Sequence, residues 1–405
     1  MAIVFTNGSV IIGDGRVLDR ATVIIEGDRI QTVSQKDIVF PRDAEVIDIN
    51  GKMLLPGFVD CHLHILIDGS PNPMAAVESN SMPMIILQAS VHARDTLMAG
   101  VTTARDMGGN GVAEIAIRDA IKLGMIQGPR LLVSGQQICM TGGQGWQFGR
   151  EADGPDDVRK AAREQIKAGC DIVKLMATGG IMTPGVEPGA AQLTVEELRA
   201  GVEEAHRANR KCASHAQGTE GILNSLAAGV DTIEHGFFLN EVCIERMRAD
   251  KIPMVPTLGP GDMIERAADF GVPEFIIEKS RQVRGPHIES LAMAKQAGIL
   301  IGMGADCGTP LLPHGSNLIE LVSLVQNGFT PEEALAIGTL NGARILGLDD
   351  QLGSISEGKL ADLVVVEDNP LADIGLLTRP ENISWVLQGG KAVKRPQLIR
   401  PVKDK

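Results

Sequence analysis

The chain has 405 residues, of which 44% are hydrophobic and 22% are charged, a composition that is typical of globular proteins and argues against disorder. Its net charge of −13 and its aromatic content of 3%, with no Tyr, argue against binding to nucleic acid or to an anionic membrane surface. No stretch approaches the length of apolar sequence that a transmembrane helix needs.

Residues 1–56 predict short strands that are separated by tight turns. Val and Ile alternate there with Gly, Asp and Asn, as in GSVIIGDG and AEVIDINGK. The starting segment MAIVFTNGSVIIGDG has no basic start and no small-residue cleavage site, so we expect a strand and a turn instead of a signal peptide. Because residues 348–405 have a similar pattern, we expect both chain ends to form one small β-sandwich domain.

Residues 57–347 alternate short β-branched runs with helical stretches, several of which end at Gly. The strand candidates number eight and are residues 54–64, 100–108, 129–138, 171–177, 211–216, 231–236, 252–258 and 299–308. Alternating strands and helices imply a parallel sheet, and this number of units predicts a (β/α)8 TIM barrel. The expected fold class is therefore α/β, with the barrel inserted between the two parts of the β-sandwich.

The six Cys residues are scattered along the chain and form no CxxC pair. Reduced, buried thiols in a cytoplasmic protein are the simplest explanation, because free Cys is among the most buried residue types. We therefore expect a cytoplasmic location and no disulfide framework.

Four of the eight His residues fall at the ends of predicted barrel strands, which is where the active site of such a barrel lies. They are His62, His64, His215 and His235. His62 and His64 have the two-residue spacing of a strand, so both side chains face the same side. With two more strand-end His residues, and with Asp306 after the last strand, the pattern indicates a metal site in preference to packed, hydrogen-bonded imidazoles.

Lys174 and Asp306 are two further candidates. Lys174 lies between apolar residues in DIVKLMATGG, where a buried ammonium is costly unless it is paired or modified. The residues alone leave open a Lys that reaches a carboxylate and a Lys that CO2 converts to a carbamate able to bridge two cations. Asp306, in GMGADCG, could ligate a metal and accept a proton from metal-bound water, or it could be a helix cap or a loop residue.

A set of motifs resembles the metal-dependent amidohydrolase superfamily. The motifs are LLPGFVDCHLH, IVKLMATGG, ASHAQG, IEHG, GADCGTPLLPHGSN and ISEGKLADLVVV, and they extend over essentially the whole chain. The chain is most similar to the branch of prolidase-like and arginine/lysine carboxypeptidase-like enzymes, near imidazolonepropionase. The resemblance implies a hydrolase of C–N bonds in small molecules.

The resemblance also implies a role for each candidate ligand. His62 and His64 match the ligands of the more buried metal. His215 and His235 match the ligands of a second metal. Lys174 matches a carbamylated lysine that bridges the two metals. The implied cofactors are thus two divalent cations and a CO2-derived carbamate.

Asp306 matches the strand-8 ligand and general base of the family. In the implied mechanism, two cations lower the pKa of a bridging water and one of them polarises the scissile carbonyl. Asp306 then takes the proton of the bridging hydroxide and passes it to the leaving amine. Zinc is the preferred metal, since imidazole-rich sites with carboxylates suit Zn, although they also admit Co, Mn or Fe.

Substrate contacts must come from the loops at the barrel mouth. Relatives usually have TGGH after strand 3, whereas this chain has MTGGQGW, so Gln144 keeps a hydrogen-bond donor but loses a possible charge, and specificity for dipeptides is open. Arg105 could bind a carboxylate or pair with a nearby acid. His314 could contact substrate or be an ordinary loop His. Trp146 and Met182 could supply an apolar wall.

The sequence is compatible with three functions. The favoured one is a dinuclear hydrolase of a small amide or dipeptide-like compound, with aryl amides, carbamates or esters as alternatives. A heterocycle deaminase or cyclic amidohydrolase with one metal would not need Lys174. A non-enzymatic assembly protein on the same barrel would tend to lose ligands, whereas all six positions are filled here. We expect a small-molecule substrate, no nucleic-acid or membrane partner, and a homo-oligomer.

Overall fold

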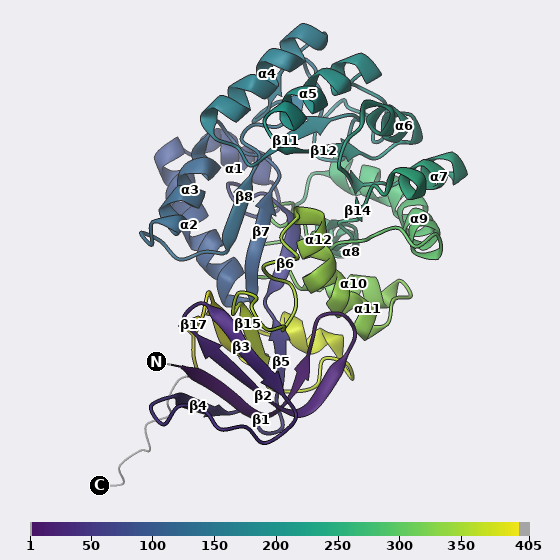
Figure 1. The fold of residues 1–405 in the computed structure, drawn as a ribbon. Coiled ribbons are helices and arrows are strands. Elements are labelled where there is room, and N and C mark those ends of the chain that lie inside the picture. The colour runs from purple at the N-terminus through teal and green to yellow at the C-terminus, as the bar shows by residue number, and fades with distance from the viewer. Residues whose placement is uncertain (1, 397–405) are drawn as a thin grey trace.

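The computed structural model describes residues 2–396, apart from the side chains of residues 265 and 266, and shows an α/β fold (Figure 1). The part of the predicted β-sandwich that comprises residues 397–405 lies outside the described residues. No helix in the described part combines the length and the apolar character needed to cross a bilayer. All six Cys residues are buried and free, as expected.

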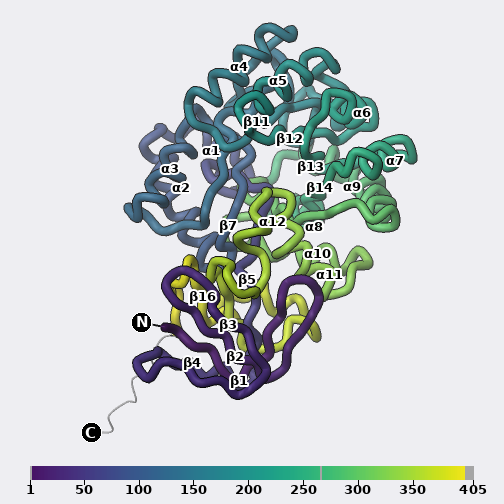
Figure 2. Tube along the Cα trace, viewed as in Figure 1, coloured from purple at the N-terminus to yellow at the C-terminus, as the bar shows by residue number. Residues whose placement is uncertain are grey.

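One sheet joins the two ends of the chain. Its strand order is β17-β16-β15-β5-β1-β2-β3, with β4 paired to β1. The strands are β1 (Ile3–Ile11), β2 (Val17–Glu26), β3 (Arg29–Ser34), β4 (Glu45–Asp48), β5 (Met53–Pro56), β15 (Leu363–Val366), β16 (Ile383–Gln388) and β17 (Lys391–Lys394). The antiparallel pairing of β5 with β15 connects the N-terminal and C-terminal parts, which lie side by side at one end of the molecule (Figure 2).

The continuous apolar sequence of β15 follows from burial on both faces. Leu363 and Val365 pack into the core of the terminal sheet, whereas Val364 and Val366 belong to the larger core that extends through the parallel strands and their helices. Adjacent strand residues point to opposite faces, so both halves of the LVVV run are apolar. The terminal sheet is thereby packed directly against the middle part of the chain.

The middle part of the chain contains parallel strands in two sheets. The first sheet has the order β6-β7-β8 and the second has the order β10-β9-β11-β12-β13-β14. Their bounds are β6 (Phe58–Leu63), β7 (Val101–Asp106), β8 (Arg130–Val133), β9 (Ile138–Cys139), β10 (Arg150–Glu151), β11 (Ile172–Met176), β12 (Lys211–Ala216), β13 (Thr232–His235) and β14 (Met254–Val255).

Backbone contacts link these two sheets at both edges. Asp171, directly before β11, donates its N–H to the carbonyl of Val133 in β8 at 2.7 Å. On the other side, Ile301 and Cys307 form parallel bridges with β14 and β6. The strands therefore follow one another in a ring, an arrangement consistent with a (β/α)8 barrel.

Four predicted strands differ in detail from the structure. Of the segment 252–258, only Met254–Val255 forms a strand, β14. The segment 54–64 is two strands, β5 and β6, separated by Gly57, where a Cβ atom would overlap the Thr102 side chain. The segment 129–138 divides into β8 and the start of β9. The segment 299–308 takes the eighth place in the ring through isolated bridges only, and Asp306 near its end has a left-handed backbone conformation with φ 56°.

Helices cover the outside of the parallel strands (Figure 1). They are α1 (Pro73–Ser79), α2 (Met82–Met98), α3 (Ala113–Lys122), α4 (Pro155–Ala168), α5 (Val195–Arg207), α6 (Thr219–Ala228), α7 (Glu241–Asp250), α8 (Gly259–Ala267), α9 (Glu274–Gln296), α10 (Ile319–Gln326), α11 (Pro331–Ala336) and α12 (Gly342–Leu346). Short helical turns occur at Ala268–Phe270, Ile337–Asn341, Ile374–Thr378 and Pro380–Asn382. As predicted, helices end at Gly: α4 and α6 stop at Gly169 and Gly229, both in the left-handed conformation.

Candidate functional site

The described residues enclose a cavity of about 1090 Å³, its open mouth included, that lies at the ends of the parallel strands. All of the predicted metal ligands line it, namely His62, His64, Lys174, His215, His235 and Asp306.

Four imidazoles and one carboxylate converge within this cavity. Ligand atoms of His62, His235 and Asp306 all lie within 4.8 Å of one another. The Nε2 atoms of His62 and His64 lie 3.7 and 3.5 Å from the same oxygen, Asp306 Oδ1. The ring centroid of His235 lies 4.9 Å from that of His62 and 4.5 Å from that of His215. The spacing between these groups is small enough for a metal ion to bind several of them.

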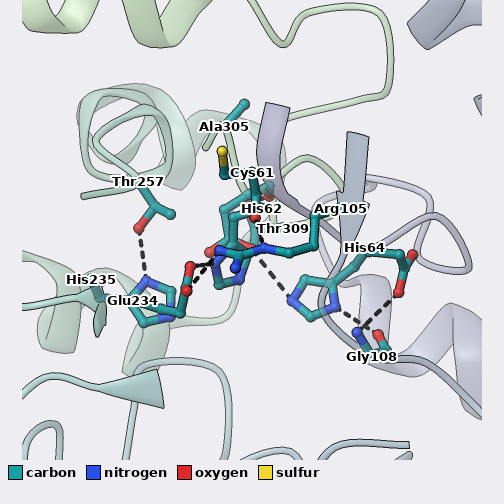
Figure 3. Close-up of polar contacts among 12 residues, drawn as sticks. Cys61, His62, His64, Arg105, Gly108, Glu234, His235, Thr257, Ala305 and Thr309 are labelled. Carbon is teal, nitrogen blue, oxygen red and sulfur yellow. Dashed lines mark hydrogen bonds and ion pairs between the residues drawn. The ribbon is translucent and has the colours of Figure 1, made fainter. Parts of the chain in front are cut away.

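Hydrogen bonds orient three of the imidazoles through Nδ1, which leaves Nε2 directed at the cluster (Figure 3). The bonds join Nδ1 of His62 to the Glu234 carboxylate at 2.8 Å, Nδ1 of His64 to the Gly108 carbonyl at 2.7 Å, and Nδ1 of His235 to the Thr257 hydroxyl at 2.7 Å. Because the carboxylate and the carbonyl can only accept, they place the proton on Nδ1 of the first two rings and free Nε2 to bind a metal.

Two atoms of the cluster are buried and have no hydrogen-bond partner among the described residues. They are His215 Nε2 and Asp306 Oδ1. A buried polar atom without a partner is costly, and natural proteins rarely leave one unsatisfied. Imidazole nitrogen and carboxylate oxygen are common ligands of divalent transition metals, so a bound cation would satisfy both atoms. The donor set therefore fits a metal centre.

Burial keeps the four imidazoles neutral. It lowers the pKa of His64 to about 4 and that of His215 to about 3. It holds the pKa values of His62 and His235 well below the ordinary value, and in all four cases the charge of Lys174 acts in the same direction. Metal binding requires neutral imidazole, so no proton has to be displaced from these rings.

Lys174 is 1% exposed and lies in β11 at the floor of the cavity. Burial lowers the pKa of its ammonium to about 8, although the charges of Glu234 and Asp306 oppose this shift. Among the side chains that the structure describes, no carboxylate oxygen lies within 4.0 Å of Lys174 Nζ. The ion pair that would explain Lys174 as a purely structural residue is therefore absent from the described part of the chain. Burial also raises the pKa of Asp306, to about 7.

Glu234 is a site residue that the sequence analysis missed. Its buried carboxylate contacts both His62 Nδ1 and Arg105 Nη2 at 2.8 Å (Figure 3). The one sequence signal is its position directly before His235 in a strand, where neighbouring side chains point to opposite faces. That signal indicates that Glu234 faces away from His235 but not that it meets His62.

Two of the predicted substrate-binding residues line the cavity. Gln144 is buried, its backbone N–H donates to the side chain of Gln192 at 3.0 Å, and its side-chain Oε1 has no hydrogen-bond partner among the described residues. Met182 packs beside the small apolar cluster around Phe148. The structure thus places a neutral amide and an apolar side chain in the same cavity as the cluster.

The other three predicted substrate-binding residues are not among the residues that line the cavity in the described structure. Arg105 is fully buried and pairs with Glu234. Of its two expected roles, the structure therefore shows the pairing with a nearby acid. His314 Nε2 lies 2.9 Å from the carbonyl of Ile67 and is used in holding that loop. Trp146 lies in a turn and is 46% exposed.

Comparison with known proteins shows that nearly the whole chain is similar to amidohydrolases. Residues 53–393 match the model of the Amidohydrolase family. Ochratoxinase of Aspergillus niger is 31% identical over 427 aligned positions that cover 96% of this chain and 86% of that protein. Its crystal structure superposes with a TM-score of 0.87 at 29% identity, covering 98% of this chain and 96% of that chain.

Two peptidase structures are also similar. A Xaa-Pro dipeptidase with methionine bound in its active site has a TM-score of 0.90 and 30% identity, covering 97% of this chain and 100% of that chain. A prolidase in complex with N-methylphosphonate-L-proline has a TM-score of 0.88 and 31% identity, covering 98% of this chain and 100% of that chain.

Proposed function

Because this chain belongs to the amidohydrolase family, we propose that it is a dinuclear hydrolase of N-acyl amino acids or dipeptide-like amides. Enzymes of this family that resemble the chain are metal-dependent and hydrolyse amide or peptide bonds of small molecules. We also infer that residues 57–347 form a complete (β/α)8 barrel and that the described parts of the two chain ends, residues 2–56 and 348–396, form the accompanying β-sandwich. The similarity to a Xaa-Pro dipeptidase and a prolidase supports this substrate class.

The observation that carries the proposal is the convergence of four imidazoles, Lys174 and Asp306 at one cavity. His62 and His64 would hold the more buried of two cations, and His215 and His235 would hold the other. Zinc is our proposed metal, since neutral imidazole with carboxylate suits it. When bound, the cations would supply polarisation of the scissile carbonyl and activation of the attacking water.

Lys174 would act as a bridging carboxylate after reaction with CO2. Burial favours the neutral amine, whose nitrogen attacks the carbon of CO2 and forms a new N–C bond while one proton is released. The resulting carbamate carries one negative charge that two cations can share. A single-metal deaminase needs no such bridge, so the buried, unpaired Lys174 favours the dinuclear enzyme.

Asp306 would move the proton during hydrolysis. Its carboxylate takes the proton of the attacking water and transfers it to the leaving nitrogen, so that the C–N bond breaks as the new C–O bond is retained. Gln144, buried in the same cavity, would offer one neutral hydrogen bond beside the scissile group, where relatives usually carry a His.

A substrate panel tests the proposal. It should contain N-acyl amino acids, Xaa-Pro and Xaa-Arg/Lys dipeptides, aryl amides and carbamates, and amino-substituted heterocycles, each assayed for a free amine and an acyl product. We expect hydrolysis of N-acyl amino acids or dipeptides. Ammonia release from heterocycles without any acyl product would contradict the amide hydrolase, whereas turnover of aryl amides alone would contradict only the peptide-like substrate class.

A further inference from the structure

One face of helix α9 forms part of the cavity wall. Its lining residues are Ser280, Val283, Arg284 and His287. Their spacing of three or four residues places them on the same side of the helix. No role follows for these residues from the metal cluster, and their chemistry differs from that of the apolar wall beside them, which includes Ile264 and Ile276.

Arg284 is held in place by only one of its two terminal nitrogens. Nη2 donates to the carboxylate of Asp262 in α8, and that carboxylate also accepts a hydrogen bond from the Ser323 hydroxyl. Nη1 of Arg284 is buried and has no hydrogen-bond partner among the described residues. A buried guanidinium N–H without an acceptor is costly, so an acceptor atom brought by a ligand would be stabilised there.

The charge of Arg284 is unusual in its surroundings. Among the cavity-lining residues whose side chains the structure describes, the other charged groups are Lys174 and Asp306 of the metal cluster. Nearby apolar residues such as Val272 keep the local dielectric low, which strengthens a charge-assisted hydrogen bond to an anion. A planar guanidinium is well suited to a carboxylate.

His287 connects this part of the wall with the metal cluster. It lies one helical turn after Arg284, and its own Nε2 is also buried without a partner among the described residues. Its ring centroid is 4.3 Å from that of Phe237, which in turn is 5.8 Å from that of His235. His235, Phe237 and His287 all line the same cavity, so its wall runs from the metal cluster to the polar face of α9.

We propose that Arg284 binds the free carboxylate of the substrate and that Asp262 positions its guanidinium. The inference rests on the proposed function and narrows it, because it selects amides that carry a carboxylate over neutral amides. It also replaces Arg105, which the sequence offered as a carboxylate-binding residue and which does not line the cavity.

The test compares N-acetyl-L-leucine with its neutral analogue N-acetyl-L-leucinamide. The ratio of their kcat/KM values is measured with the metal-loaded enzyme, with Arg284→Met and with Arg284→Lys. We expect the wild type to prefer the acid and Arg284→Met to lower the acid-to-amide ratio about tenfold or more, mainly through KM for the acid, as for the loss of a charge-assisted hydrogen bond. Arg284→Lys keeps the charge opposite Asp262 and should give an intermediate ratio, which separates lost binding from misfolding.

Arg281→Gln is the matched control, since Arg281 lies on the exposed face of the same helix. It removes one positive charge from α9 and should leave the ratio at the wild-type value. An Arg284→Met enzyme with the wild-type ratio, or an Arg281→Gln enzyme with the same loss, would overturn the assignment to Arg284.

Calorimetric binding of both compounds to Asp306→Asn, with and without Arg284→Met, provides a readout that does not depend on turnover. The acid should bind Asp306→Asn more tightly than the carboxamide, and Arg284→Met should remove this difference. Equal binding of acid and carboxamide would refute the carboxylate site even if the wild type hydrolyses both. Preferred binding of the acid without hydrolysis of either compound would instead contradict the proposed function and leave the carboxylate site standing.

Discussion

His62 Nδ1 lies 2.8 Å from the Glu234 carboxylate, although the two residues are 172 positions apart in the chain. The same carboxylate also receives the guanidinium of Arg105 at 2.8 Å. Both contacts are fully buried. One oxygen of Glu234 pairs with the Arg105 guanidinium, which balances the charge of the carboxylate, and the other oxygen orients the imidazole of His62. The cluster thus depends on a carboxylate that does not itself face the cavity.

We predict that Glu234→Gln lowers metal affinity about 10- to 100-fold, the usual effect of losing such an outer partner. The amide can keep a hydrogen bond to His62 but no longer neutralises Arg105. Metal retention under chelator competition, followed by elemental analysis, measures the change.

A surface carboxylate serves as the control for this prediction. Glu333 pairs with Lys295 at 2.7 Å on the outside of the molecule. Because exposed ion pairs contribute little, Glu333→Gln should retain metal as the wild type does. Equal metal retention in Glu234→Gln and the wild type would show that the contact to His62 does not tune the site.

We predict that Lys174→Ala loses most of the second metal and nearly all activity, because no carbamate can form to bridge the cations. Short carboxylic acids such as acetate or propionate should restore part of both, since they can enter the space left by the side chain. Metal content and turnover are measured with and without the acid. Near-normal values in Lys174→Ala would make the lysine structural.

We predict that Asp306→Asn preserves the fold but lowers kcat by about 100-fold or more, the scale expected for loss of a general acid–base group. The amide occupies the same volume but does not accept the proton from the attacking water. Circular dichroism checks the fold, and a pH–rate profile checks the chemistry. A loss below about tenfold at every pH would remove Asp306 from proton transfer.

We predict about two metal ions per chain, because the side-chain donors together with a bridging carbamate exceed one tetrahedral set. Elemental analysis of protein prepared without chelator measures this number. Removal of metal should abolish activity, and zinc added with bicarbonate should restore it. Full activity at a stoichiometry near one would contradict the dinuclear site.

Strand periodicity made a large part of the site predictable. His62 lies in β6 and His64 directly follows that strand, so their two-residue spacing directs both side chains into the cavity, and the strand-end positions of His215 and His235 bring them to the same cavity. These positions follow from the alternating side-chain direction along a β-strand, which is the same in every protein. Asp306 could be placed with them because it follows the last predicted strand.

Finer backbone features were less predictable. The sequence suggests one strand over 54–64, but the chain leaves the terminal sheet at Gly57 and enters the barrel at Phe58. The segment 299–308 contains strand-like residues and yet forms only isolated bridges. In both cases the neighbouring strands decide where regular pairing ends, because backbone groups pair with partners that are distant in sequence.

The sequence by itself determined the alternation of strands and helices, the family and the set of polar side chains at the strand ends. Only the tertiary structure decided which polar groups are engaged elsewhere and which are free. Arg105 is used by Glu234, whereas Arg284 keeps Nη1 without a partner at the cavity wall among the described residues. The physical reason is that periodicity is local, whereas the hydrogen-bond partner of a buried charge is set by how distant segments pack together.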